Sequence, residues 1–414
     1  MNFVKTSFYS GIGTAVNIVV RLVTNKIIAV YLGTNGMFLL GQLRDFLKFT
    51  TVFSNLGTTN GTIKYVSDHK EDIGRLKQYL ITGFNIHLIC SVIVGVLTFL
   101  FNKQLSVYLF DDSQYSTYLN VLALSLVTLS LHTFFMSVLN GMKKIKLYVI
   151  INIISALISA VVLVLLVLYF DTIGALYAFA VNQILILLIS YLLISYYRPF
   201  KLRQLFGRIN KNAFTNLSKF SIMAIAGPLC TIAATFFVRT FLSDTFDKDH
   251  AGSWEGMWRI SAMYLLFLTT TFKFYLLPTF SSISGIALKR EVFKVWRFIV
   301  PIILLITITI YVLKDIVIVT LLDDQFMLIS TLMGFHLIGD VIRINGWVLG
   351  NILIAKAKTK AFVFFQIEWA VVFGVLTFVL VQSYGFLGVS MAYFGAYLIH
   401  FILMNIYFRK LLWL

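Results

Sequence analysis

Long apolar segments constrain the fold of this 414-residue chain more than any other feature. Runs of about 20 residues with few charges recur along the whole sequence, and each is long enough to cross a bilayer as a helix. Within the bilayer every backbone polar group must be bonded internally, which favours helices. Charged residues make up only 12% of the chain, against about 25% in soluble domains. These features predict an all-α polytopic membrane protein.

The apolar windows predict twelve transmembrane helices in two pseudo-symmetric lobes of six. The first set covers 6–31, 37–65, 77–101, 115–139, 146–169 and 173–196, with a tight turn at Gly33–Gly36. The second set covers 214–242, 254–282, 292–313, 326–354, 361–382 and 386–408. The expected domains are an N-terminal lobe over 1–197, a cytoplasmic basic linker over 198–213 and a C-terminal lobe over 214–414.

Basic residues are distributed unevenly between the connections. One alternating set holds most of them, including the 198–213 linker and Arg409, whereas the other set holds acidic pairs such as Asp111 with Asp112. The positive-inside rule therefore places the basic connections and both termini in the cytoplasm. This distribution explains much of the net charge of +17 without any binding to nucleic acid.

Charged side chains in the first two spans predict a polar pathway. Asn17 and Arg21 share one helical face, and Arg44, Asp45 and Lys48 keep to one side of the next helix. A charge inside a bilayer is costly unless it faces protein or water. Two neighbouring helices that turn basic stripes away from lipid therefore predict a central cationic cavity.

The second half carries further charges, and their roles are open at this stage. His336, Asp340, Arg343, Trp347 and Asn351 form one stripe along the tenth span. Asp340 and Arg343 can be a structural ion pair or part of a coupling site. We predict that the polar and charged residues on the first, second and tenth spans include the substrate-binding and coupling residues.

Three further basic residues complete the predicted binding set. Arg259 either faces the cavity or pairs with Glu255 one turn earlier, Arg239 either lines the cavity or snorkels, and Lys273 lies near the face of Arg259. Gly36, Gly41 and Arg44 share their spacing with Ala251, Gly256 and Arg259, which indicates an internal repeat and favours the cavity for Arg259. The candidate substrate-binding residues are Asn17, Arg21, Arg44, Lys48, Arg239, Arg259, Lys273, Arg343 and Asn351. The candidate coupling or structural residues are Asp45, His336, Asp340 and Glu368.

Sequence motifs for catalysis are missing. The chain has no P-loop, no His-Glu-x-x-His and no cysteine cluster, so we expect a transporter without cofactor or metal. His87, His132 and His400 stand singly on apolar helices and are interpreted as packing histidines with satisfied hydrogen bonds rather than as proton carriers.

Several stretches spread over nearly the whole chain carry a family resemblance. They are Lys26–Gly33, Leu43–Phe46, Gly61–Val66, Lys219–Ala224, Trp254–Pro278, Gly339–Val341 and Leu353–Ala357. These residues resemble the Wzx-type flippases of O-antigen and enterobacterial common antigen. The resemblance implies the MOP (multidrug/oligosaccharidyl-lipid/polysaccharide) superfamily. In related lipid-linked flippases arginines of the first, second and eighth helices face the cavity, and Arg21, Arg44 and Arg259 match those positions.

The resemblance implies a flippase that moves an undecaprenyl-diphosphate-linked oligosaccharide to the periplasmic leaflet of the bacterial inner membrane by alternating access. Membrane lipids, a polysaccharide polymerase and a chain-length regulator are the expected partners. Moving about two negative charges outward is favoured by roughly 4–5 kcal/mol at 100 mV, so no coupling ion is required. The alternatives are a cation-coupled multidrug exporter, which would need a less basic cavity, and a membrane glycosyltransferase or polymerase, which would need a longer external loop.

Overall fold

The computed structural model describes the backbone of residues 3–200, 202–219 and 221–414. The side chains of residues 3–11, 203, 204, 267, 270–274 and 278 lie outside this description. Over the described backbone the regular secondary structure is helical, without strands. Nine helices in the described part of the chain are long and apolar enough to cross a membrane. The chain divides into two compact units.

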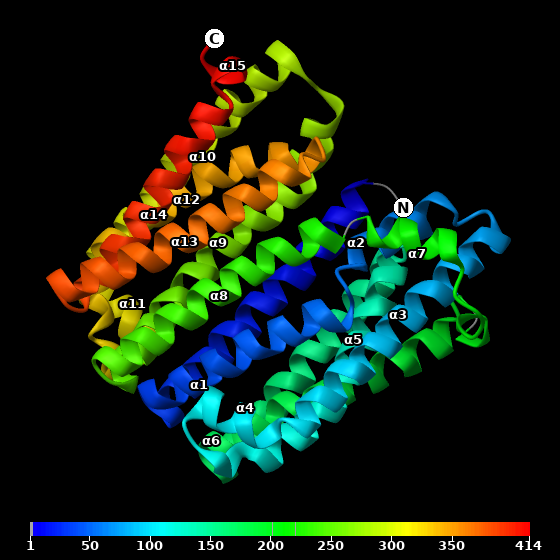
Figure 1. Ribbon diagram of the computed structural model, residues 1–414, viewed down its shortest axis with the longest axis horizontal. Helices are drawn as coiled ribbons and strands as arrows, with labels where there is room; N and C mark the ends of the chain where they lie inside the picture. Colours follow the sequence, from blue (N-terminus) through cyan, green and yellow to red (C-terminus); the bar gives the residue numbers. More distant parts are fainter. Residues whose placement is uncertain (1–2, 201, 220) are drawn as a thin grey trace. The chain divides into compact units, whose positions relative to one another are not determined.

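The N-terminal unit comprises Met1–Leu32 and Leu39–Leu229. Its helices are α1 (Phe3–Ser54), α2 (Thr59–Asp68), α3 (Ile73–Leu100), α4 (Asn102–Phe110), α5 (Ser116–Gly141), α6 (Ile145–Tyr197) and α7 (Lys211–Ser218). α5 packs against α2, α3 and α6, and α3 and α5 run side by side in Figure 1. Buried Phe134, Leu139 and Ile151 form part of the core at these contacts.

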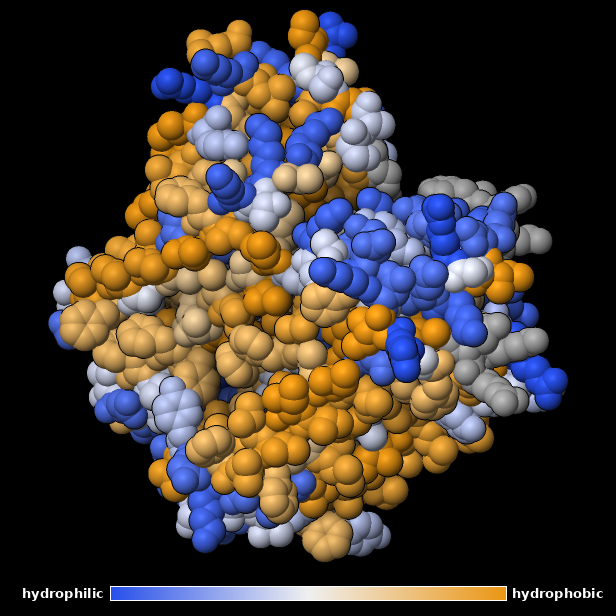
Figure 2. Space-filling model, turned by 45° about the vertical axis from the view of Figure 1, so that its right-hand side comes forward, coloured by the Kyte–Doolittle hydropathy of each residue, from blue (hydrophilic) through white to orange (hydrophobic). Residues whose placement is uncertain are grey.

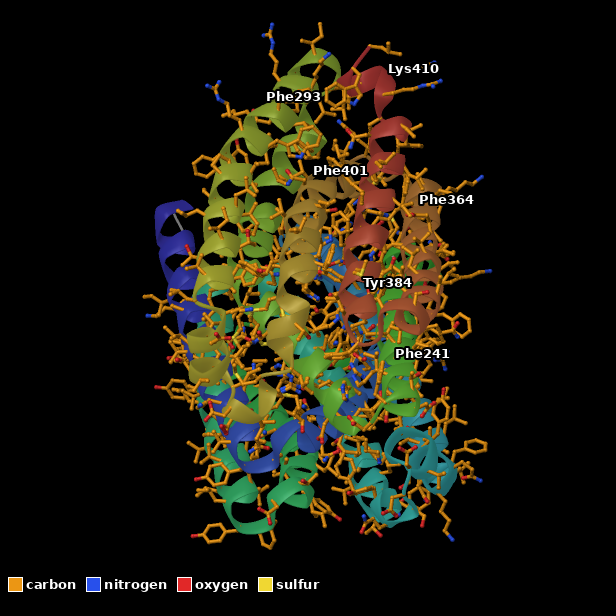
Figure 3. The ribbon with its side chains drawn as sticks, turned by 90° about the vertical axis from the view of Figure 1, so that its left-hand side faces the viewer. Phe241, Phe293, Phe364, Tyr384, Phe401 and Lys410 are labelled. Carbon is orange, nitrogen blue, oxygen red and sulfur yellow. The ribbon has the colours of Figure 1, made fainter. Side chains whose placement is uncertain are left out.

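The C-terminal unit comprises Gly33–Phe38 and Cys230–Leu414. Its helices are α8 (Ser221–Thr245), which begins in the other unit, α9 (Lys248–Ser282), α10 (Gly285–Val312), α11 (Lys314–Leu321), α12 (Ile329–Ala355), α13 (Thr359–Tyr384), α14 (Leu387–Tyr407) and α15 (Arg409–Leu412). α12 packs against α9, α10 and α14, and α14 also packs against α13. Figure 3 shows α13 beside α14, with Phe364 near the start of α13 and Tyr384 at its end.

Two helices are too long for a single crossing, and each is interrupted once. α1 has 52 residues and α6 has 53, whereas about 20 residues span a bilayer. The interruptions are Gly33 (φ 62, ψ −161) in α1 and Asp171 (φ 49, ψ −132) in α6. The predicted turn at Gly33–Gly36 is therefore wrong in length. One residue is enough because glycine adopts this backbone conformation without a steric penalty.

A second glycine lets the interruption of α1 lie against α9. A Cβ built on Gly252 would stand 2.0 Å from the backbone oxygen of Thr34, so no other residue fits there without movement of the chain. The hydroxyl of Thr34 also donates a hydrogen bond to Asp249, in the first turn of α9. These contacts explain why Gly33–Phe38 belongs to the C-terminal unit.

Two predicted spans are wrong at one end. The span predicted over 37–65 ends at Ser54, because Leu56 (φ 47) and Gly57 (φ 63) leave the helical conformation before α2 begins. A Cβ on Gly57 would stand 3.0 Å from the backbone oxygen of Ser221, so this break allows close approach of α8. The span predicted from residue 214 likewise begins later, since residues 211–218 form the separate helix α7.

The outer faces of the long helices are apolar. Figure 2 shows wide hydrophobic areas on one face of the molecule, with hydrophilic residues gathered in patches toward its margins. Val96 and Phe99 on α3 and Phe364, Val371 and Val375 on α13 are exposed. Apolar surface on this scale is not sustained in water, and it fits contact with lipid.

Candidate functional site

The polar and basic residues predicted on the first half of α1 and at Arg44 have the following contacts. Arg44 Nη2 donates to Asn25 Oδ1 over a long 3.4 Å, and its guanidinium carbon lies 5.8 Å from the ring centre of Phe179. The Arg21 side chain is exposed and makes no ion pair within the described part of the chain. The Asn17 amide bonds within its own helix, to the carbonyl of Gly13 at 2.8 Å. The exposed guanidinium of Arg21 therefore has hydrogen-bonding capacity for a ligand.

Asp45 and Lys48, further along α1, form an ion pair whose two side chains differ strongly in exposure. Lys48 Nζ lies 3.0 Å from Asp45 Oδ1. The Asp45 side chain is 2% exposed, whereas that of Lys48 is 63% exposed. The lysine therefore carries its charge to the surface while the carboxylate stays inside the unit.

In the C-terminal unit, Glu255 on α9 binds two arginines at once. Arg239 Nη2 on α8 donates to Glu255 Oε2 at 2.8 Å, and Arg259 Nε donates to Oε1 at 3.2 Å. Arg239 is 2% exposed and Arg259 5%. The snorkelling interpretation of Arg239 is therefore wrong, and Arg259 makes the Glu255 pairing that the sequence left as an alternative. Both arginines are anchored by this carboxylate within their own unit.

Asp340 on α12 is fully buried and accepts hydrogen bonds from three hydroxyl groups. Its Oδ2 accepts from Ser261 Oγ at 2.6 Å and from the Tyr264 hydroxyl, both on α9. Its Oδ1 accepts from the Tyr393 hydroxyl on α14 at 2.6 Å and lies 3.7 Å from Arg343 Nη1. One carboxylate therefore ties three helices together.

Arg343 lies in an aromatic cage. Its guanidinium carbon is 4.5 Å from the ring centre of Trp347, 5.1 Å from that of Trp258 and 5.4 Å from that of Tyr397. Nη1 also donates to the Tyr393 hydroxyl at 2.9 Å. Cation–π contacts of this kind are worth about 2 kcal/mol or more when desolvated. The cage and Asp340 together hold the guanidinium in a buried position.

His336 is stacked rather than hydrogen-bonded. Its ring is parallel to that of Tyr393, with centres 3.9 Å apart, and the residue is fully buried. Neither ring nitrogen has a hydrogen-bond partner within the described part of the chain. Full burial and stacking on Tyr393 are typical of a packing histidine.

Glu368 on α13 pairs with His400 on α14. Glu368 Oε2 lies 2.7 Å from His400 Nδ1. His400 is thus buried and hydrogen-bonded, in keeping with its interpretation as a satisfied packing histidine, but the sequence does not show that α13 brings a carboxylate against it. His400 also lines a cavity of about 90 Å3 together with Arg343, Gln366 and Trp369.

The remaining predicted residues contribute less to these clusters. The Asn351 amide bonds within its own helix, to the carbonyl of Trp347 at 2.8 Å. The side chain of Lys273 lies outside the described residues. Within the described part of the chain, no group of three or more His, Cys, Asp or Glu side chains is placed to hold a metal.

The sequence locates the charged residues but does not identify most of the side chains that contact them. Glu255 is absent from the candidate site residues, although its i, i+4 spacing to Arg259 offers the pairing as an alternative, and the sequence does not show that Glu255 also binds Arg239. Ser261 and Tyr264 share a face of α9, and Tyr393 lies on α14, but none of these pointed to Asp340 from sequence alone. Their meeting depends on how α9, α12 and α14 pack.

The fold is that of a MATE-type membrane transporter. An inward-facing multidrug resistance MATE family transporter of the MOP superfamily matches with a TM-score of 0.78 at 14% identity, over 95% of each chain. A MOP superfamily transporter from Pyrococcus furiosus, described as having a reversed binding-pocket polarity, matches with a TM-score of 0.68 at 12% identity, over 96% of each chain. At these identities the likeness concerns the fold alone.

The sequence profile of the polysaccharide biosynthesis protein family matches residues 3–284. This match covers more than half of the chain, and the protein belongs to that family. The lipid III flippases of Escherichia coli (strain K12) and of Shigella flexneri are each 26% identical to it over 402 residues, covering 97% of this chain and 97% of theirs.

Proposed function

We propose that this protein is a flippase for a lipid-linked oligosaccharide, a transporter and not an enzyme. The observation that carries the proposal is the full-length relationship to lipid III flippases, over 97% of both chains. The fold agrees, because MATE-type transporters of the MOP superfamily share it. The substrate is expected to be an undecaprenyl-diphosphate-linked repeat unit of a surface polysaccharide, moved from the cytoplasmic to the periplasmic leaflet by alternating access.

The membrane topology of the proposal has twelve crossings. Nine candidate spans occur in the described part of the chain. The two longest helices are divided once each, α1 at Gly33 and α6 at Asp171. Two crossings from each of these give eleven, and α9 supplies the twelfth. We expect two six-helix lobes in the bacterial inner membrane, with both termini in the cytoplasm because the basic connections lie on that side.

The α1 residues are the best-suited ligands for the diphosphate. Arginine binds phosphate oxygens in a bidentate manner, and lysine adds a compact point charge. Arg21 and Lys48 are exposed, and the hydrogen bond from Arg44 Nη2 to Asn25 Oδ1 is long at 3.4 Å. Arg239 and Arg259 already engage Glu255, and Arg343 lies in its cage. We therefore place the primary headgroup contacts on Arg21, Arg44 and Lys48.

A multidrug exporter is the alternative that the shared fold allows. Exporters of cationic drugs need acidic or neutral aromatic binding surfaces, whereas the acids here are already engaged. Glu255 binds two arginines and Asp340 accepts three hydroxyls beside Arg343. This occupation favours an anionic lipid headgroup over a cationic drug. The polymerase and chain-length regulator stay predicted partners.

Substitution of the two arginines tests the proposal. We expect Arg21→Ala and Arg44→Ala each to abolish export of the lipid-linked oligosaccharide while membrane abundance stays near normal, because each substitution removes a proposed contact to the headgroup. Export is measured as the fraction of lipid-linked glycan that becomes accessible on the outer leaflet of proteoliposomes. Arg44→Lys should be partly active, since the charge remains and the bidentate contact is lost.

Lys26→Ala, on the same helix, serves as the matched control and should retain export. Full export by both alanine variants would exclude headgroup binding by Arg21 and Arg44. A purified protein that exports no lipid-linked glycan under any condition would contradict the flippase function itself.

A further inference from the structure

The connection between α6 and α8, residues 198–220, is strongly basic and contains no acidic residue. Lys201 and the side chain of Arg203 lie outside the described residues. The other basic residues of this connection are all exposed, and they are Arg198, Arg208, Lys211 and Lys219. A block of like charges that faces outward makes a field that attracts ions of the opposite sign. The connection is therefore a candidate surface for an anionic partner.

Hydrogen bonds hold this connection against α3. The side-chain amide of Asn85 on α3 donates to the carbonyl of Gly207 at 3.3 Å. The backbone N–H of Asn210 donates to the hydroxyl of Thr82, also on α3, at 3.1 Å. The short helix η2 (Leu202–Leu205) and α7 both pack against α3 as well. The connection is thus a fixed platform, and its basic side chains keep their places on it.

The apolar side chains of the connection divide between two faces. Leu205 and Leu217 are buried in the core of the N-terminal unit. Phe206 is 70% exposed, and Ile209 and Phe214 are exposed as well. Large apolar side chains that are exposed beside basic ones are typical of a segment that lies in the interface between water and lipid. The outer face therefore matches a membrane surface in both hydrophobicity and charge.

The end of α6 supports an interfacial position for the connection. Tyr196 and Tyr197 are both exposed, at 79% and 55%, and they directly precede Arg198. Tyrosine is enriched at the boundary between water and membrane, where its ring meets apolar groups and its hydroxyl meets water. The connection therefore begins at the depth of the lipid headgroups.

Two acidic residues of the nearby α2–α3 connection are already opposite other bases. Lys70 Nζ lies 3.8 Å from Glu71 Oε1, and Arg75 Nε lies 3.5 Å from Asp72 Oδ2. These four residues contribute no net charge as a group. They therefore do not neutralise the positive charge of the α6–α8 connection.

We propose that the exposed face of the α6–α8 connection binds the phosphate headgroups of anionic phospholipids at the membrane surface. Arg198, Arg208 and Lys211 supply the charge, since basic side chains form strong hydrogen bonds with phosphate oxygens. Phe206 and Phe214 insert between the headgroups. The predicted cytoplasmic position brings this face to a leaflet whose surface is negative. The surface shares no residue with the proposed transport site, and its binding of lipid does not rest on the flippase function.

Lipid retention tests the charged part of the surface. The purified full-length protein is placed in nanodiscs with equal amounts of phosphatidylglycerol and phosphatidylcholine, and native mass spectrometry counts the lipids that stay bound. The wild type should retain phosphatidylglycerol in preference. Arg208→Gln combined with Lys211→Gln should weaken this retention about twentyfold, because each basic residue near an anionic surface strengthens the attraction about fivefold. Added salt should weaken the wild-type retention, since it screens exposed charges.

A matched control removes the same charge elsewhere in the N-terminal unit. Lys144→Gln combined with Lys146→Gln changes two exposed lysines at the start of α6 and should leave retention unchanged. Arg208→Lys combined with Lys211→Arg keeps both charges and should retain phosphatidylglycerol, which checks that the surface still folds. Unchanged retention in the Arg208 and Lys211 glutamine variant would overturn the proposal. An equal loss in the control would also overturn it, because the attraction would then belong to the charge of the whole unit.

The diphosphate of a lipid-linked glycan is the other phosphate source at a membrane surface. An equimolar amount of lipid-linked glycan should leave the bound phosphatidylglycerol in place. Displacement would assign the surface to the transport substrate and would contradict binding of phospholipid. Glycan export in proteoliposomes is a separate readout. Its absence in the wild type would count against the flippase function, whereas phosphatidylglycerol retention would be unaffected.

A spin label tests the apolar part of the surface. Cys90 and Cys230 are replaced by serine, and Phe206→Cys then carries the label. We expect the label to be accessible to oxygen dissolved in lipid and protected from a water-soluble relaxation agent. Ser113→Cys, at an exposed position in η1 (Ser113–Tyr115), gives the water-exposed reference. Equal accessibility of the two labels to the water-soluble agent would overturn the interfacial position.

Discussion

The two units treat the same kind of residue in opposite ways. In the N-terminal unit, Arg21 is exposed, the Asn25 contact of Arg44 is long, and Lys48 is 63% exposed. In the C-terminal unit, Arg239 is 2% exposed and Arg259 5% exposed, and both bind Glu255. Basic residues in apolar helices therefore have two different surroundings in one chain.

The difference lies in the partner and not in the cation. A buried arginine with a carboxylate in ideal reach is part of the fold, because removal of either partner leaves an uncompensated charge. A basic residue with a weak or exposed contact can bind a ligand at little cost to the unit that carries it. The predictions below test this division, from the largest expected effect to the smallest.

Loss of the shared carboxylate should cause the largest change. Glu255→Gln leaves Arg239 and Arg259 buried without their anion, and we expect about 3–5 kcal/mol lower free energy of unfolding. Denaturant unfolding of the detergent-solubilised protein measures this. Glu71→Gln is the matched control, because Glu71 is 90% exposed and lies 3.8 Å from Lys70, and it should be nearly silent. Near-normal stability of Glu255→Gln would break the comparison.

Asp340→Asn should have an intermediate effect. The amide keeps an acceptor for the hydroxyls but removes the charge beside Arg343, so we expect a loss of roughly 1.5–3 kcal/mol and lower abundance. The double variant Asp340→Asn with Arg343→Gln should recover most of this loss, because no charge is left uncompensated. Normal abundance combined with lost transport would instead make Asp340 a coupling residue and move it out of the structural class.

Lys48→Ala should hardly change the stability of the N-terminal unit. The lysine is mostly exposed, and exposed ion pairs contribute about 0–1 kcal/mol. Glycan export should fall, however, since the substitution removes a positive charge from the proposed headgroup site. Stability and export are measured on the same preparation. A large loss of stability without any loss of export would reverse the assignment of this residue.

The smallest expected effect concerns Asp247, an exposed acid in the connection before α9. Asp247 caps α9, and hydrogen bonds from the backbone N–H and then the ring of His250 lower the pKa of its carboxyl group. A lowered native pKa gives stability that is present above the unfolded-state pKa and is lost as the pH falls through the native pKa. The wild type should therefore lose a small amount of stability as the pH falls through the native pKa of Asp247, and Asp247→Asn should not show this loss. An unchanged pH profile of the melting temperature would contradict this.

The membrane class, most helix positions and the location of the charges follow from the sequence. Hydrophobicity is a local property, because each spanning segment must satisfy its own backbone within the bilayer. The ends of the spans at Ser54 and Ser221 were missed, since they depend on the close approach between Gly57 and the start of α8. The family resemblance agrees with the match to polysaccharide biosynthesis proteins, because it is carried by stretches distributed along the chain.

Only the packing of the helices shows which partner each buried charged residue contacts. Asp340 meets Ser261 and Tyr393 from positions 79 and 53 residues away, and Glu368 meets His400 from 32 residues away. The energy of a buried charge depends on the distance and geometry of such partners. Helical periodicity determines the face on which a residue lies but not the neighbour that this face meets. For that reason the stripe of Asp340 and Arg343 was visible in the sequence, whereas its hydroxyl donors and the pairing of His400 were not.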